Sequence, residues 1–277
     1  MFSLSFYIGL ILIGIFVGFV SGLLGVGGGF LMVPLQYFLF TSAGIDSSLA
    51  MVVSVATSLA IIIPTASSGA YRHQKVNKSI IKPGISLGIF GIIGSFCGGL
   101  VAVYIPVFAL KLIFAILLVC IALNMIRESL KEESDSEDSE ENARLSFNIL
   151  TLACVGLAVG LLSGLLGIGG GIFIIPILTI LFGFKLTKAI GTSSVYISLT
   201  AIGGVISYII SGWGVNPLPL ALGYVSLLNW ILIVIFSVPM ASLGAKYAYK
   251  VPEKQLRIIF AILMIFIAIK MLGLLPF

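Results

Sequence analysis

The chain has 277 residues, of which 60% are hydrophobic and only 9% are charged. A soluble domain usually carries about 25% charged residues, so these few charges cannot cover a water-facing surface. Lipid must therefore surround most of the chain, which excludes an ordinary soluble enzyme or binding domain. The net charge of +5 does not indicate nucleic acid. The cations stand in short loops between apolar runs, where lipid headgroups and membrane orientation explain them.

Apolar runs along the chain predict membrane-spanning helices, because a span needs about 20 residues with a rise of 1.5 Å each. The runs are continuous rather than alternating, which disfavours a β-barrel. Two shorter runs, at about 30–40 and 172–184, follow clusters of glycine and are too short to cross unaided. The expected full-length spans are about 4–24, 49–71, 83–104, 108–126, 146–167, 188–210, 218–240 and 255–275.

The acidic residues concentrate in one segment near the middle of the chain. Of the ten, eight lie between Glu128 and Glu141. A segment of this composition cannot bury apolar surface and is typical of a solvated linker. We therefore expect three regions: a first transmembrane repeat over residues 1–126, an acidic cytoplasmic linker over 127–145 and a second transmembrane repeat over 146–277.

The two membrane regions share three sequence matches in the same order. Residues 18–35, GFVSGLLGVGGGFLMVPL, align without a gap with residues 160–177, GLLSGLLGIGGGIFIIPI, at an offset of 142. Residues 56–58, Ala-Thr-Ser, match residues 191–193, Gly-Thr-Ser, and the last apolar run of each half gives the third match. Ordered matches of this kind predict an internal duplication.

The distribution of Lys and Arg orients the two halves. If each half crosses five times, with the short run counted as a crossing, 13 of the 15 cations lie on the side of the linker. If each half crosses four times, the division is 8 against 7. The positive-inside rule favours the first arrangement, with both termini outside. The expected fold is an all-α integral membrane protein with two inverted-topology repeats of about five helical segments each, and a glycine-broken short helix in each half.

Each half carries a GxGGG cluster, Gly25 to Gly29 and Gly167 to Gly171. Consecutive glycines break a helix and let a ligand approach the backbone. The helix that follows directs its first N–H groups toward the break, which is an anion site in principle. A purely structural break is the alternative. Pro34 and Pro176 each stand five residues past the last glycine, and we assign them a structural role.

Further glycines recur every four residues before each cluster, in the small-xxx-small pattern of close helix packing. Packing is therefore expected of Gly14, Gly18, Gly22, Gly156, Gly160 and Gly164.

Hydroxyl and amide side chains are the polar groups expected near the glycine clusters. The spans hold no evident Asp or Glu of the kind that ion-coupled carriers often use. Backbone N–H and hydroxyl donors without a fixed cation suit a small oxyanion, although Ser and Thr also bond the preceding turn of their own helix. The residues expected to contact substrate are Gly27, Gly28, Gly29, Thr57, Ser58, Gly169, Gly170, Gly171, Thr192, Ser193, Ser21, Ser163 and Gln36.

The sequence contains no plausible catalytic or metal-binding constellation. The only histidine, His73, lies in a basic loop and is expected at the cytoplasmic surface. The three cysteines stand alone in apolar runs and are interpreted as packing residues. We therefore expect a protein that is not an enzyme and holds no cofactor and no metal.

The paired motifs GLLGVGGGFLMVPL and GLLGIGGGIFIIPI resemble the signature of the sulfite exporter TauE/SafE family of membrane permeases. The Ala-Thr-Ser and Gly-Thr-Ser elements and the acidic linker are similar to its other shared features. The resemblance covers about 4–126 and 146–275. Its implied site residues are Gly27, Gly28, Gly29, Pro34, Thr57 and Ser58, with Gly169, Gly170, Gly171, Pro176, Thr192 and Ser193.

This resemblance implies a multi-pass protein of a bacterial-type plasma membrane whose partners are the lipid bilayer and a small anion. The implied cargo is a small sulfur-containing oxyanion such as sulfite or an organosulfonate, and export is the expected direction. Two other classes stay open. One is a carrier or channel for a different small solute, and the other is a non-transporting membrane scaffold.

Overall fold

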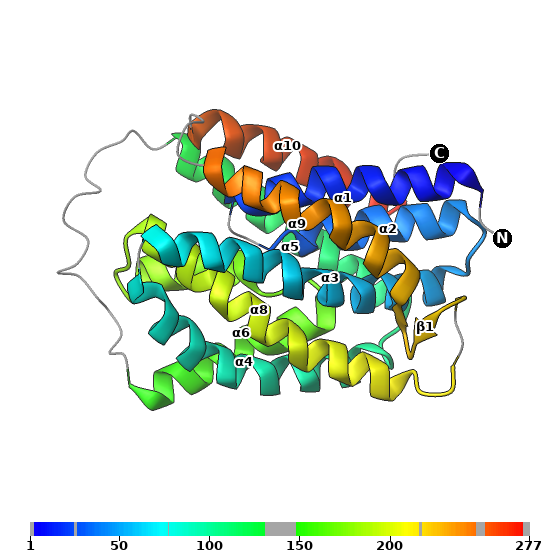
Figure 1. Ribbon diagram of the computed structural model, residues 1–277, viewed down its shortest axis with the longest axis horizontal. Helices are drawn as coiled ribbons and strands as arrows, with labels where there is room; N and C mark the ends of the chain where they lie inside the picture. Colours follow the sequence, from blue (N-terminus) through cyan, green and yellow to red (C-terminus); the bar gives the residue numbers. More distant parts are fainter. Residues whose placement is uncertain are drawn as a thin grey trace.

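A computed structural model gives the structure of residues 3–24, 27–76, 78–130, 148–215, 218–247 and 253–273. These residues form a bundle of ten α-helices (Figure 1). Seven helical stretches among them are long and apolar enough to cross a membrane. The prediction of an α-helical, multi-pass protein is thereby confirmed. The described chain also contains a small antiparallel ladder between β1 (Ala221–Leu222) and β2 (Val225–Ser226).

The bounds of the helices follow the apolar runs closely in most places. In the first half they are α1 Leu4–Leu24, α2 Gly29–Ser42, α3 Ser47–Val76, the 3-10 turn η1 Lys78–Ile80, α4 Ile81–Ala102 and α5 Val107–Leu130. In the second half they are α6 Ile149–Leu166, α7 Gly171–Pro176, the π-helical turn η3 Ile177–Leu181, α8 Leu186–Ser211, α9 Leu227–Tyr247 and α10 Glu253–Met271.

Two boundaries differ from the sequence-based expectation. The span expected over 218–240 begins only at Leu227, because the residues before it form the β1–β2 hairpin. Pro219 has no N–H to donate to a helix, and Gly223 adopts a left-handed φ of 58°. Helix α5 continues to Leu130, so the first four residues of the expected linker are helical. The rest of that linker, 131–145, lies outside the described residues.

Short polar signals fix both ends of the connection between α2 and α3. Gly44 takes a left-handed φ of 84° just after α2. Asp46 then caps α3, since its Oδ1 accepts hydrogen bonds from the amides of Leu49 at 3.3 Å and Ser48 at 2.8 Å. These backbone bonds lower the pKa of the Asp46 carboxyl below its ordinary value.

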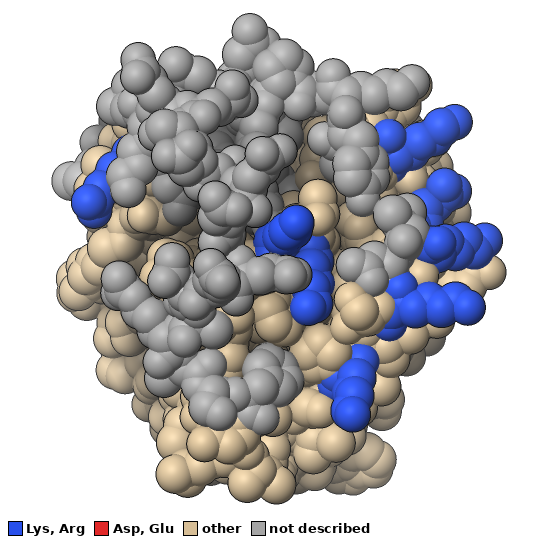
Figure 2. Space-filling view, turned by 90° about the vertical axis from the view of Figure 1, so that its left-hand side faces the viewer, with Lys and Arg blue, Asp and Glu red and all other residues tan. Residues whose placement is uncertain are grey.

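The helix ends separate a basic end of the bundle from an end with few charges. Helix α1 begins and α10 ends at the right of Figure 1, whereas α5 ends and α6 begins at the left. Figure 2 looks onto that left end and shows Lys and Arg side chains gathered there. The exposed cations on the helix ends and turns at this end, which we call the basic end, are Arg72, Lys75, Lys78, Lys82, Arg127, Lys185 and Lys246.

The closest helix pairs join the two halves of the sequence. Helix α1 packs along α9, and α6 packs along α4. A Cβ atom on Gly18 would lie 2.5 Å from Ser237 Cα, and one on Gly160 would lie 2.5 Å from the carbonyl oxygen of Gly91. Only glycine permits so close an approach of two backbones. The packing role predicted for the four-residue glycine stripes is confirmed.

The outer surface of the bundle is apolar, as expected for contact with lipid tails. Leu12 is 60% exposed, Ile235 58% and Ile262 61%. The interpretation of the cysteines as packing residues is wrong, because the side chains of Cys97, Cys120 and Cys154 are all exposed. An isolated apolar residue on a helix faces either lipid or protein, and the apolar run around each cysteine is equally compatible with both.

Candidate functional site

The two glycine clusters form left-handed turns immediately before α2 and α7. The φ angle is +80° at Gly27 and +71° at Gly28, and it is +81° at Gly169 and +80° at Gly170. A residue with a Cβ atom pays roughly 1–2 kcal/mol for this conformation, so the turns depend on glycine. Glycine therefore interrupts the helices at equivalent positions in both halves.

The turns lie against each other at the centre of the bundle. A Cβ atom on Gly29 would lie 2.7 Å from the Gly167 carbonyl oxygen and 2.7 Å from Ile168 Cα. The start of α2 thus rests directly on the backbone of the second turn.

Two isoleucine side chains lie against both turns. A Cβ atom on Gly27 would lie 3.0 Å from Ile197 Cγ2 and 3.8 Å from Ile62 Cγ2. A Cβ atom on Gly169 would lie 2.7 Å from Ile197 Cγ2 and 3.3 Å from Ile62 Cγ2. Ile62 and Ile197 are fully buried and come from α3 and α8. The space next to both turns is therefore apolar.

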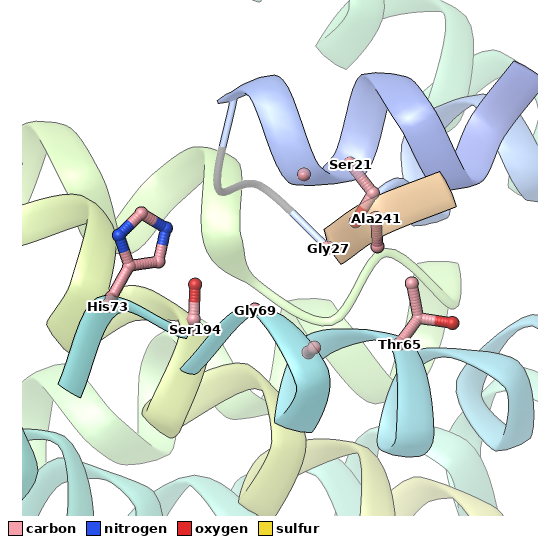
Figure 3. Close-up of a pocket in the computed structure, with 9 residues that line it drawn as sticks. Ser21, Gly27, Thr65, Gly69, His73, Ser194 and Ala241 are labelled. Atoms are coloured by element: carbon pink, nitrogen blue, oxygen red, sulfur yellow. The ribbon is translucent and has the colours of Figure 1, made fainter. Parts of the chain in front are cut away.

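A cavity lies beside the first turn, between α1, α3, α8 and α9. The cavity is small, with enclosed space for about one water molecule, because its empty volume of about 220 Å³ includes open solvent. Figure 3 shows Ser21 and Ala241 on one side of it, with Thr65, Gly69, His73 and Ser194 on the other. The lining residues are Ser21, Gly22, Gly27, Thr65, Ala66, Gly69, His73, Ser194 and Ala241, among which the described residues of the second turn do not occur.

The placement of His73 corrects the sequence-based expectation. His73 is only 7% exposed and lines the cavity, so it is not a surface residue. Helix α3 continues to Val76, and Thr65, Gly69 and His73 follow one another at four-residue spacing on one face of it. That spacing was the available signal. The basic residues beside His73 suggested a loop instead.

The two Thr-Ser pairs have different roles in the two halves. Ser58 donates a 2.9 Å hydrogen bond to the Gly167 carbonyl oxygen, so α3 of the first half holds the turn of the second. Thr57 Oγ1 accepts a 3.1 Å bond from the amide of Ser226. In the second half Thr192 is fully buried, and its hydroxyl has no partner in the described chain. Ser193 is fully buried as well.

The equivalent serines Ser21 and Ser163 each lie under one turn. A Cβ atom on Gly28 would lie 3.0 Å from Ser21 Cβ, and one on Gly170 would lie 3.5 Å from Ser163 Cβ. Ser21 lines the cavity. Ser163 is fully buried, and its hydroxyl has no partner among the described residues. Of this pair, only Ser21 can reach a solute in the cavity as it stands.

Gln36 and the two prolines lie farther along the short helices. Pro34 stands inside α2, whereas Pro176 ends α7 and is followed by the π-helical turn. Gln36 is seven residues beyond the start of α2, or about 10 Å along the helix. It is fully buried and is not among the residues that line the cavity. In the described chain neither its Oε1 nor its Nε2 has a hydrogen-bond partner.

Comparison with known proteins decides the family. The family model described as sulfite exporter TauE/SafE matches residues 10–271. The chain belongs to this family. A probable membrane transporter protein of Methanocaldococcus jannaschii is 35% identical over 254 residues, which are 90% of this chain and 89% of that protein. One of Haemophilus influenzae is 34% identical over 269 residues, or 94% and 96% of the two chains. No solved structure matches.

The TauE/SafE proteins are membrane transporters, and this chain is a multi-pass membrane transporter of the family rather than an enzyme. Both sequence-based expectations are confirmed at this level.

Gln36 offers a test that separates substrate contact from structure. The equivalent residue of the second half is Leu178, which is fully buried. A buried amide without a partner costs roughly 1–3 kcal/mol, so Gln36→Leu is expected to raise the melting temperature in detergent. If Gln36 contacts substrate, the variant loses flux despite its greater stability. A variant with higher stability and unchanged flux would remove Gln36 from the substrate path.

Proposed function

We propose that this TauE/SafE transporter exports a small sulfur-containing oxyanion, such as sulfite or an organosulfonate, across a plasma membrane. The observation that carries the proposal is the cavity beside the first glycine turn. Its lining supplies the Ser21 hydroxyl and the His73 imidazole as donors, and it includes no carboxylate. The Thr65 and Ser194 hydroxyls donate to the carbonyl oxygens of Ile61 and Ile190 in their own helices. Such a lining suits an anion, since hard cations need oxygen ligands that carry negative charge.

The cavity lies toward the basic end of the bundle. It extends along α3 from Thr65 to His73, and α3 ends three residues later at Val76. Exposed cations at that end raise the local concentration of anions. Under the positive-inside rule this end is cytoplasmic, together with the acidic linker. An anion that leaves the cell from this side moves with a membrane potential of about 2.3 kcal/mol per charge per 100 mV.

The transport mechanism in this proposal is alternating access between two inverted repeats of five segments. Equivalent glycines support the repeat arrangement, because Gly18 meets Ser237 of α9 in the same way that Gly160 meets Gly91 of α4. The equivalent residues Ile62 and Ile197 lie against both glycine turns. In this reading they form the barrier that an anion must pass when the cavity changes sides.

The inverted arrangement predicts that single cysteines at positions 78 and 213 react from opposite sides of the membrane. Both positions are exposed, and Trp213 is 73% exposed. Lys78→Cys is expected to react with an impermeant thiol reagent only from the cytoplasm, and Trp213→Cys only from outside. Both are made after the three native cysteines are replaced by serine. Labelling of both from one side would reject inverted topology.

Flux into proteoliposomes tests the cargo directly. Purified protein is reconstituted, and the movement of radiolabelled sulfite, sulfoacetate and sulfate is followed with and without an imposed potential. We expect saturable flux of at least one sulfur oxyanion, faster when the potential draws the anion through the protein. A preparation that moves none of these anions faster than empty liposomes contradicts the proposal, and leaves a different small solute or a scaffold role.

A further inference from the structure

The cavity has an equivalent region in the other half of the chain. The Thr-Ser pairs of α3 and α8 match at an offset of 135 residues. At that offset Thr65, Ala66 and Gly69 correspond to identical residues in α8, namely Thr200, Ala201 and Gly204. Two of the cavity's polar residues do not repeat. His73 corresponds to Tyr208, and Ser194 corresponds to Leu59.

In the second half the equivalent space is filled. A Cβ atom on Gly204 would lie 2.6 Å from Leu59 Cδ1. The Tyr208 hydroxyl donates a 3.0 Å hydrogen bond to the Gly164 carbonyl oxygen. Leu59 is fully buried, and Tyr208 is 1% exposed. This region is closed by one apolar side chain and by one hydroxyl that is already bonded.

In the first half the same space is open and polar. A Cβ atom on Gly69 would meet only the Ser194 Oγ, at 3.8 Å. His73 and Ser21 line the cavity, and neither side chain makes a hydrogen bond or an ion pair in the described part of the chain. The repeated Thr-Ala-x-x-Gly frame is thus shared, but among the described residues the first half leaves open space beside its glycine and the second half does not.

We propose that His73 and Ser21 form an anion-binding subsite in this cavity, and that the small Ser194 leaves room for the anion. This inference rests on the proposed function. It names the residues that would bind the anion first as it enters from the cytoplasmic side. A neutral imidazole offers one N–H donor and a protonated one offers two, and the Ser21 hydroxyl offers another. Charge-assisted bonds from such donors hold oxyanions strongly.

The nature of the neighbours favours an anion over a metal ion. His73 is the only histidine in the chain, and the cavity lining includes no cysteine and no carboxylate. Arg72 and Lys75, which flank His73 in the sequence, are exposed and positively charged. A cation would find one nitrogen ligand in a positive field, which is a poor site. An oxyanion would find donors and a favourable field.

The test measures sulfoacetate binding by calorimetry in detergent, and sulfoacetate flux with KM and maximal rate separated. His73→Ala is expected to raise Kd and KM at least about tenfold, a change of about 1.4 kcal/mol, while the melting temperature stays near that of the native protein. His73→Gln keeps one N–H donor and should lie between the two. Ser194→Leu, which copies Leu59, should weaken binding by removing room.

The matched control is Arg72→Ala, which removes an exposed charge on the same turn of α3. It should change Kd much less than His73→Ala, because it alters the field but not the contact. Equal effects of the two variants, or native Kd and KM in a folded His73→Ala protein, would overturn the subsite while the proposed transport stands. A native protein that neither binds nor moves sulfur oxyanions would instead overturn the proposed function, and the subsite with it.

Discussion

Gly69→Leu is expected to reduce anion flux strongly without unfolding the protein. A Cβ atom at this position has only the Ser194 Oγ within 4 Å, at 3.8 Å, so a side chain here begins in the cavity and meets no backbone. Leucine also favours a helix over glycine by about 0.8 kcal/mol. The melting temperature should therefore be native or higher. Flux should fall at least about tenfold, which is about 1.4 kcal/mol.

The equivalent substitution in the other half supplies the control. At Gly204 a Cβ atom would lie 2.6 Å from Leu59 Cδ1 and 2.8 Å from Ser95 Oγ. Gly204→Leu should therefore lower the melting temperature before it affects transport. Gly69→Ala fills less of the cavity and should keep part of the flux. If Gly69→Leu is stable and moves anions at the native rate, the cavity is not on the transport path.

Most of the fold follows from local sequence because hydropathy and glycine act locally. Apolar length alone placed α1 at Leu4–Leu24, and the triple glycines placed the two helix breaks. The start of α9 was missed because Leu218, Leu220 and Ala221 are apolar, so hydropathy continued through them. Pro219 and Gly223 carried the contrary signal, which is conformational rather than hydrophobic.

The candidate site was harder to predict, because side-chain contacts depend on which helices meet. The repeat singled out Ser58, but its bond to Gly167 exists only because α3 of one half lies against the turn of the other. The repeat also placed most of the candidate residues in equivalent pairs. The cavity depends instead on positions where the halves differ, such as His73 against Tyr208. A search for identical residues in the two halves reveals shared structure but passes over such a difference.

The glycine turns themselves are poor targets for large substitutions. Gly28 has φ +71°, and a Cβ atom there would lie 2.8 Å from Val17 Cγ1. Leucine at Gly28 or Gly170 would strain the backbone and disturb packing, so lost flux would say little about substrate contact. Substitutions that enter the cavity from α3 test the site without that ambiguity.

The second large effect is expected on stability, from Gly18→Val in α1. Its Cβ atom would lie 2.5 Å from both Cα and the carbonyl oxygen of Ser237, so the backbones of α1 and α9 must move apart. Overpacking of a well-packed contact usually costs about 1–3 kcal/mol, and a backbone cannot yield by changing rotamer. We expect a lower melting temperature in detergent, and a smaller monodisperse fraction on size-exclusion chromatography.

Valine at Gly9, also in α1, is the matched control. At Gly9 a Cβ atom would meet the far end of the Leu39 side chain, at 2.9 Å, which can change rotamer. Gly9→Val should therefore cost little, although both variants place valine in the same helix. Gly160→Val, the repeat equivalent of Gly18→Val, should be as damaging, since it faces the Gly91 carbonyl oxygen at 2.5 Å. A bundle that tolerates Gly18→Val as well as Gly9→Val would mean that α1 and α9 do not cross this closely, and the paired packing of the two halves would lose its main support.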